Sequence, residues 1–179
     1  MRRVFLTGVS GLLGTNIAHE LLEAGYEVTG LLRKKAAYRG RQHPALRLIE
    51  GDLFKDLSSV LRNTDAVIHA AAETRQNLLH YSDYSKINFN ATVMLYLAAV
   101  QCGVKRFVYI STANTIGHGN AARPGNEEME PRQPFTSSFY ARSKTEAERY
   151  LLEQKGCPEV VVLNPTFMLG AYGTSAGSS

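Results

Sequence analysis

The sequence predicts an α/β domain with a doubly wound parallel sheet of the Rossmann type, in three αβα layers. Two observations predict it. Short runs of apolar residues recur along the chain, and segments with helical spacing of their apolar residues separate them. Strands that are apolar throughout belong to parallel sheets with both faces covered. Right-handed crossovers then place the helices on the two faces.

Length and composition support a single folded domain. The chain has 179 residues, of which 44% are hydrophobic and 20% charged, so it can bury a sizeable core and is not disordered. No apolar run approaches the roughly 20 residues that span a bilayer. The first run breaks at Thr7 and Gly8, unlike an export signal, so we expect a cytoplasmic protein that binds no membrane.

In the first half of the chain the apolar runs predict three strands, at residues 2–7, 27–32 and 46–50. Between the first two, residues 12–24 have apolar side chains at helical spacing, and Gly25 ends that helix. A short helix is predicted at residues 53–61, after the third strand.

The second half continues the alternation. Strands are predicted at residues 66–70, 106–111 and 160–163, and helices at 87–101 and 138–154. Residues 1–170 are therefore expected to form one dinucleotide-binding domain that also carries the catalytic residues. The glycine- and serine-rich residues 171–179 are typical of a linker-like tail.

The turn between the first strand and the first helix carries three glycines. Gly8 would allow a tight turn, Gly11 would let the backbone approach a pyrophosphate, and Gly14 would let the helix pack close to the sheet. Ser10 and Leu12 lie in the same turn, where the helix N-terminus offers free N–H groups to phosphates. The alternative is a plain strand-to-helix turn; the strand–turn–helix context favours dinucleotide binding.

Tyr140 and Lys144 are the candidate proton-transfer pair. They are four residues apart on a predicted helix, so both side chains lie on one face. A free tyrosine has a pKa of about 10, and a nearby ammonium group lowers it. Tyr140 could then exchange a proton with a substrate oxygen while hydride moves to or from a nicotinamide. The alternative is a surface pair on an amphipathic helix.

The end of the second strand indicates which nicotinamide cofactor is used. No acidic residue follows the strand; three cations do, beginning with Arg33. An arginine there can accommodate the 2′-phosphate of NADP(H), whereas NAD sites usually carry a carboxylate. The alternative is a solvated basic loop. With only Tyr38 as an interleaved aromatic, a nucleic-acid patch is not favoured.

Taken in order, these motifs resemble the extended short-chain dehydrogenase/reductase family, also called the NAD-dependent epimerase/dehydratase family. Residues 7–14 match its TGxxGxxG signature, and residues 140–144 match its YxxxK element. Further matches are Gly51-Asp52-Leu53 after the third strand, HxAA at residues 69–72, Asn-x-x-Gly-Thr at 88–92 with Ala91 in place of glycine, and Arg-Pro-x at 164–166 with Asn164 in place of arginine.

The resemblance assigns roles to residues that spacing alone does not. It places Lys144 on the nicotinamide ribose and Thr112 on the catalytic serine or threonine that orients the substrate oxygen; the alternative for Thr112 is an ordinary strand-end hydroxyl. Asn88 either completes a catalytic tetrad or braces its helix. The cofactor-binding residues it implies besides the glycine turn and Arg33 are Asp52, Leu53, Ala70, Ala71 and Pro165.

We therefore expect an NADP(H)-dependent oxidoreductase that acts on a carbonyl or secondary alcohol of a small-molecule substrate. The segment from Gly25 to Arg33 is similar to the dihydroflavonol reductase and cinnamoyl-CoA reductase branch. Two alternatives remain: a nucleotide-sugar epimerase with tightly held NAD, and a non-catalytic dinucleotide-binding module. The resemblance also implies a homodimer and a C-terminal substrate-binding part beyond this chain.

A metal site is not expected, because the five histidines show no ligand spacing. His69, at the end of the fourth predicted strand, is interpreted as a structural residue rather than a base.

Overall fold

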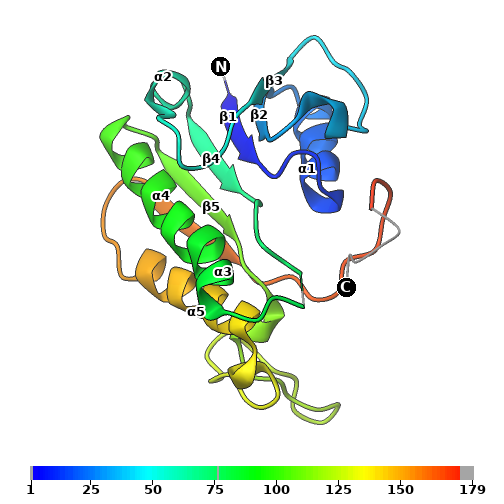
Figure 1. Ribbon diagram of the computed structural model, residues 1–179, viewed down its shortest axis with the longest axis vertical. Helices are drawn as coiled ribbons and strands as arrows, with labels where there is room; N and C mark the ends of the chain where they lie inside the picture. Colours follow the sequence, from blue (N-terminus) through cyan, green and yellow to red (C-terminus); the bar gives the residue numbers. More distant parts are fainter. Residues whose placement is uncertain (1, 76, 174–179) are drawn as a thin grey trace.

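Six parallel strands form one sheet in the order β3-β2-β1-β4-β5-β6 in the computed structural model of the chain, which describes residues 2–75 and 77–173 (Figure 1). The strands are β1 (Arg3–Thr7), β2 (Glu27–Leu32), β3 (Leu46–Glu50), β4 (Ala66–His69), β5 (Arg106–Ile110) and β6 (Glu159–Leu163). The order reverses between β1 and β4, and ligands of such sheets bind in the crevice at the carboxyl ends of the strands there. The predicted doubly wound sheet is confirmed.

Helices cover the sheet from both sides, because alternate strand residues face opposite ways. On one face, α1 (Leu12–Glu23) buries Ala18 and Leu22 against Leu6 and Val28. The other face is covered by α4 (Ala91–Gln101) and α5 (Phe139–Leu152) (Figure 1). These two helices pack over Phe5 of β1, which precedes Leu6, and over side chains of β4 and β5.

The two helical layers differ in extent. On the α1 side, Val108 of β5 and Val161 of β6 are only half-buried, and Leu163 is exposed. Within residues 2–75 and 77–173, no helix lies over that part of the sheet. Of the two predicted helical layers, the one on this face thus consists, among the described residues, of α1 alone, which covers only the strands nearest to it.

The helix predicted at residues 53–61 was too long: α2 has only four residues (Ser58–Leu61). The preceding segment is held in turns by two aspartates. The Asp52 carboxylate accepts a hydrogen bond from the Phe54 backbone N–H at 2.7 Å, and the Asp56 carboxylate accepts one from Ser58 at 2.9 Å. Aspartates that bond the backbone two residues ahead favour turns over helix.

The helical run that contains α4 begins earlier than predicted. It starts with α3 (Tyr81–Ser85), passes through one π turn, η2 (Lys86–Asn90), and continues as α4. Polar serine and aspartate residues in α3 hide its helical spacing. A π turn inside a helix is often found at functional sites, and this one carries Asn88. The remaining short helices are η1 (Lys35–Ala37), η3 (Ala113–Thr115) and η4 (Phe135–Ser137).

The start of the predicted tail packs against α1. The Asn16 side-chain amide donates to the Ala171 carbonyl at 3.0 Å, and the Tyr172 ring meets His19 edge-on with centroids 5.2 Å apart. Residues 174–179 of that tail lie outside the described residues. None of the helices in the described part of the chain is long and apolar enough to cross a bilayer.

Candidate active site

The glycine turn lies tightly against the end of β4. Gly8 has a φ of +71°, and a Cβ there would be 2.8 Å from the backbone carbon of Ala70 and the nitrogen of Ala71. Gly8 therefore meets both the conformational and the spatial demand for glycine. A Cβ at Gly14 would overlap the Gly8 carbonyl, so this glycine lets the helix pack against the turn that directly follows β1.

The N-terminus of α1 is open to an anionic group. Its N-cap is Gly11, no side chain caps the first turn, and that turn contains no acidic residue. Gly11 is exposed, Ser10 and the first helical residue Leu12 are half-buried, and a Cβ at Gly11 would point at the Gly8 carbonyl 3.4 Å away. Uncapped N–H groups and the helix dipole suit a diphosphate, so these residues fit a dinucleotide.

His69 is the centre of a buried chain of hydrogen bonds. Its Nδ1 is 2.7 Å from the Thr7 hydroxyl and its Nε2 is 2.9 Å from the Thr92 hydroxyl. Thr7 accepts from the Ala71 N–H and Thr92 donates to the Asn88 carbonyl, so Thr7 donates to Nδ1 and Nε2–H donates to Thr92. Burial, and then the charge of Lys144, lower the pKa of His69 to about 3. A neutral, fully bonded imidazole matches the predicted structural role.

Asn88 is also fully bonded. Its Oδ1 accepts from the Glu73 N–H at 2.7 Å, and its Nδ2 donates to the Glu73 carbonyl and to the Ser143 hydroxyl, each at 3.0 Å. Ser143 in turn donates to the Tyr140 carbonyl at 2.8 Å. Of the two roles left open by the sequence, this geometry supports the brace, which ties α5 to the loop after β4.

Lys144 is buried where α5 crosses the end of β5. Its Nζ donates to the Ile110 carbonyl at 2.7 Å and lies 4.1 Å from the centroid of the Tyr109 ring, with 1% of the residue exposed. Burial lowers the pKa of Lys144 to about 7, and the charge of Glu148 opposes that shift.

Tyr140 lies one helical turn before Lys144, next to Thr112. Burial raises the pKa of Tyr140 above its ordinary value, and a hydrogen bond with the Thr112 side chain opposes that rise. Thr112 is the side chain that lowers the pKa of Tyr140 here, and a lowering by Lys144 beside a bound nicotinamide stays a prediction. The backbone of Thr112 is extended at the start of η3. Its hydroxyl also accepts a hydrogen bond from the Asn114 N–H at 3.3 Å.

The other predicted cofactor residues follow strands at the two sides of the sheet, Asp52 and Leu53 after β3 and Pro165 after β6. The Pro165 carbonyl accepts from the Ala113 N–H at 2.9 Å, which places it beside Thr112. Leu53 is half-buried and packs on the core cluster between the sheet and α4, while Asp52 is exposed.

Arg33 is exposed at the end of β2. The pKa of the Glu73 carboxyl is lowered chiefly by a hydrogen bond from Arg75, and the charge of Arg33 lowers it further. A second carboxylate near the basic segment was missed from the sequence. Glu50, which ends β3, accepts a hydrogen bond from the Lys35 N–H at 2.5 Å. It comes from the neighbouring strand, and the sequence alone does not show which strand lies beside β2.

Glu148 is a second residue that sequence reasoning missed. One oxygen of its carboxylate accepts hydrogen bonds from the side chains of Ser111, Thr115 and Asn164. Its only sequence signal is the position four residues after Lys144, which puts it on the same helical face.

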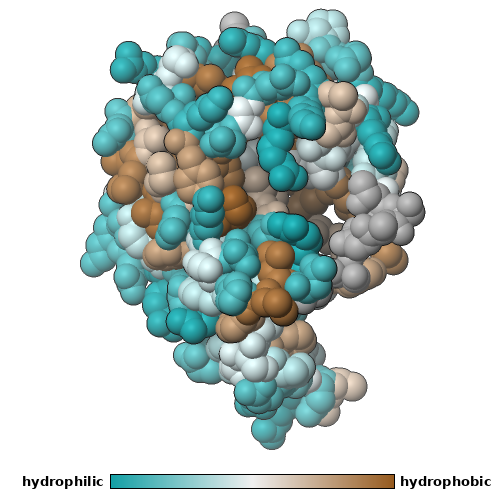
Figure 2. Space-filling model, in the orientation of Figure 1, coloured by the Kyte–Doolittle hydropathy of each residue, from teal (hydrophilic) through white to brown (hydrophobic). Residues whose placement is uncertain are grey.

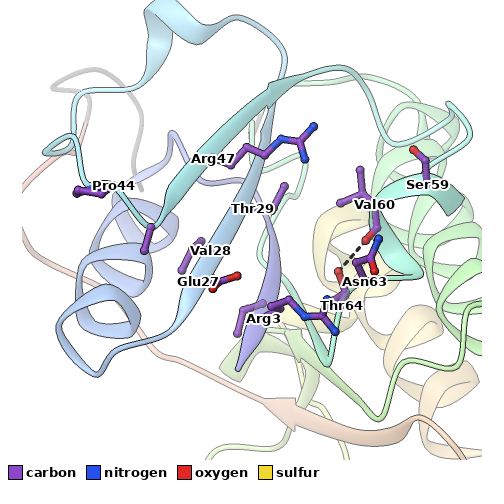
Figure 3. Close-up of a pocket in the computed structure, with 12 residues that line it drawn as sticks. Arg3, Glu27, Val28, Thr29, Pro44, Arg47, Ser59, Val60, Asn63 and Thr64 are labelled. Carbon is purple, nitrogen blue, oxygen red and sulfur yellow. Dashed lines mark hydrogen bonds between the residues drawn. The ribbon is translucent and has the colours of Figure 1, made fainter. Parts of the chain in front are cut away.

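A hollow of about 520 Å³ lies elsewhere, between the short α2 and the starts of β1 and β2 (Figure 3). Arg3, Glu27 and Arg47 are among the residues that line it. Because ligands of parallel sheets bind at the carboxyl ends of the strands, this hollow at the amino ends is not the active site.

Comparison with known proteins identifies the family. The family model of the NAD dependent epimerase/dehydratase family matches residues 4–178. The chain belongs to this family. The predicted resemblance is thereby confirmed, and with it the expectation of a Rossmann domain.

Members of the epimerase/dehydratase family with different activities are about equally similar to this chain. A 3-beta-hydroxysteroid dehydrogenase of Mycolicibacterium neoaurum is 30% identical over 165 residues, which cover 86% of this chain and 43% of that protein. A UDP-glucose 4-epimerase of Vibrio cholerae is 30% identical over 180 residues, which cover 94% of this chain and 52% of that protein. The chain thus spans about half the length of these relatives.

A solved structure agrees with the fold. MoeE5, in complex with UDP-glucuronic acid and NAD, has a TM-score of 0.73 and 31% identity over 89% of this chain and 52% of its own.

The close approach at the glycine turn predicts a difference between two glycines that share the same backbone conformation. Gly8 and Gly25 have φ values of +71° and +78°, but a Cβ at Gly25 would meet nothing within 4 Å. Gly25→Ala should cost about 1 kcal/mol of unfolding free energy, the price of a left-handed alanine. Gly8→Ala should cost at least twice that, because the backbone of Ala70 and Ala71 must also move. Urea unfolding measures both, and equal losses would contradict the packed turn.

Proposed function

We propose that this chain is the cofactor-binding and catalytic part of an NADP(H)-dependent oxidoreductase acting on a carbonyl or secondary alcohol. The observation that carries the proposal is the pairing of Tyr140 with Thr112 one helical turn from the buried Lys144. All three lie at the carboxyl end of β5, on the edge of the sheet to which the glycine turn also belongs. A proton donor, an orienting hydroxyl and a cation are the groups that carbonyl reduction needs.

The cofactor would be held by groups already described. The Gly8–Gly11 turn and the uncapped start of α1 would bind the diphosphate, and Lys144 the nicotinamide ribose. When bound, the nicotinamide supplies or accepts hydride at the substrate carbon.

The protein's own residues would manage the substrate oxygen. The Thr112 hydroxyl orients it toward Tyr140, whose phenol donates a proton as hydride arrives and recovers it from solvent afterwards. The raised pKa of Tyr140 keeps its phenol protonated, so the phenol acts as a proton donor rather than a base unless a nearby charge lowers that pKa. The charge on Lys144 stabilises the phenolate that the donation leaves behind.

NADP(H) is proposed over NAD(H) because the loop after β2 presents exposed cations. Arg33 is exposed at the strand end, where it can reach a 2′-phosphate with a charge-assisted bond. The carboxylate of Glu50, at the end of β3, accepts a hydrogen bond from the Lys35 backbone N–H and therefore lies beside this loop.

An epimerase of nucleotide sugars is the second candidate, and the similarity to the Vibrio cholerae enzyme favours it. It would use Tyr140, Lys144 and Thr112 in the same roles while keeping NAD bound through the cycle. Dinucleotide released by heating the purified protein in stoichiometric amount would favour the epimerase over the reductase.

A homodimer is proposed from the surface of α4. Met94, Leu97 and Val100 of α4 are three residues apart in turn and 45%, 46% and 41% exposed. Figure 2 shows brown surface in the region where Figure 1 draws α4. An apolar stripe of this kind on a helix suits packing against a second copy.

Removing the phenol of Tyr140 tests the proposed proton donor. Tyr140→Phe should lower the turnover of NADPH with a panel of aldehydes and ketones at least 100-fold, since a positioned acid contributes about 10²–10⁴. NADPH affinity should be unchanged. Tyr150→Phe, on the same helix, is the matched control and should keep its activity. Equal turnover by Tyr140→Phe and the unchanged protein would eliminate Tyr140 as the donor.

Replacing Arg33 tests the choice of cofactor. Arg33→Ala should weaken NADPH binding at least about tenfold, because a hydrogen bond to a charged group contributes about 1.5–3 kcal/mol, and should leave NADH binding unchanged. Arg39→Ala, an exposed position in the same basic segment, is the control. Fluorescence titration with both dinucleotides measures the affinities. NADH bound as tightly as NADPH by the unchanged protein would refute the NADP(H) assignment.

A further inference from the structure

One carboxylate oxygen joins three segments that are far apart in the sequence. Oε2 of Glu148 on α5 accepts hydrogen bonds from Ser111 Oγ at 2.6 Å, Thr115 Oγ1 at 2.9 Å and Asn164 Nδ2 at 3.1 Å. Ser111 follows β5, Thr115 ends η3, and Asn164 follows β6. Glu148 thereby ties the carboxyl ends of two neighbouring strands to the helix that carries Tyr140 and Lys144.

The tied segment contains Thr112. Thr115 Oγ1 also lies 2.7 Å from the Thr112 carbonyl, and Asn164 Nδ2 lies 3.3 Å from the same carbonyl. The Thr112 carbonyl is therefore held by two side chains that also contact Glu148, and the single hydroxyl proton of Thr115 is shared between that carbonyl and the carboxylate. The position of the Thr112 hydroxyl relative to Tyr140 follows from this arrangement, because Tyr140 is on the same helix as Glu148.

The hydrogen-bond donors of Glu148 do not neutralise its charge. Its three donors are neutral, and none of the four ion pairs found among residues 2–75 and 77–173 includes it. Position 164, where the family resemblance places an arginine, is occupied by the neutral Asn164. The carboxylate instead acts on Lys144, one helical turn earlier on the same face.

The other described groups that face Lys144 carry no negative charge, so Glu148 is its counter-charge. From β4, His69 is neutral; from β5, the Tyr109 ring and the Ile110 carbonyl contact the ammonium group. Tyr140, on the same helix, is held as a neutral phenol by its raised pKa. Burial lowers the pKa of Lys144, and the charge of Glu148 opposes this shift by raising the pKa.

We propose that Glu148 is a positioning residue with two tasks: it clamps the Thr112 segment onto α5, and it holds Lys144 in the ammonium form. Its relevance to catalysis rests on the proposed function, but the coupling to Lys144 can be measured without any turnover.

Glu148→Gln tests the charge, because glutamine keeps the size and an acceptor oxygen. Lysine labelled with 13C at Cε reports the titration of Lys144 by NMR, with Lys144→Met identifying its signal. The midpoint should fall by about one pH unit in Glu148→Gln, as expected for the loss of a nearby opposite charge. The protonated fraction at pH 7 would then fall about fivefold. Glu153→Gln, an exposed position at the end of α5, should leave the midpoint unchanged.

Glu148→Asp separates the two tasks and serves as the second variant should the glutamine protein not fold. The shorter side chain keeps the charge but withdraws the oxygen from its three donors. The titration midpoint of Lys144 should stay within a few tenths of a pH unit of its value in the unchanged protein. The kcat should fall at least tenfold, and the KM for NADPH should be unchanged. In Glu148→Gln the alkaline limb of the kcat/KM profile should also move to lower pH.

An unchanged Lys144 midpoint in Glu148→Gln would overturn the coupling, whatever the turnover. Unchanged kcat in Glu148→Asp would overturn the clamp. A shifted midpoint in a protein that turns over no carbonyl compound would instead overturn the proposed function and leave the coupling to Lys144 in place.

Discussion

The site depends on one interior contact, the ammonium group of Lys144 against the Ile110 carbonyl and the Tyr109 ring. Burying a cation is unfavourable. A pKa that falls from 10.5 to about 7 corresponds to about 4 kcal/mol of lost stability at neutral pH. An apolar side chain would fill this place at lower cost. The contact holds α5 over the end of β5, and together with the hydrogen bonds of Glu148 it sets Tyr140 beside Thr112.

From this contact, buried polar groups extend across the sheet to the glycine turn. Asn88 joins α5 to the loop after β4, and its carbonyl accepts from Thr92. Thr92 is bonded to His69, and His69 to Thr7, which precedes the turn. Because every member of this chain is satisfied, the network is rigid and fixes the distance between the glycine turn and α5. The proposed cofactor-binding and proton-transfer parts are thus joined through neutral hydrogen bonds, with Lys144 between them.

Much of the fold could be predicted from the sequence, since the buried parallel strands are apolar throughout; β2 and β3 have the predicted bounds. The errors lie where side chains bond their own backbone, as Asp52 and Asp56 do before α2. Within the site, Gly8 and the pairing of Tyr140 with Lys144 could be proposed from motif spacing, whereas Thr112 was named only through the family resemblance. The role of Glu148 could not be predicted, because its partners come from three separate segments. The raised pKa of Tyr140 depends on burial, which spacing does not report.

We propose that Lys144 is kept for cofactor binding and proton transfer although its burial costs stability. Urea unfolding of Lys144→Met at pH 7, alongside NADPH titration of the same protein, tests this proposal. The free energy of unfolding should rise by about 1 kcal/mol or more, because an apolar side chain replaces a buried cation, while NADPH affinity should fall. A less stable variant that still binds NADPH normally would show that Lys144 serves the fold alone.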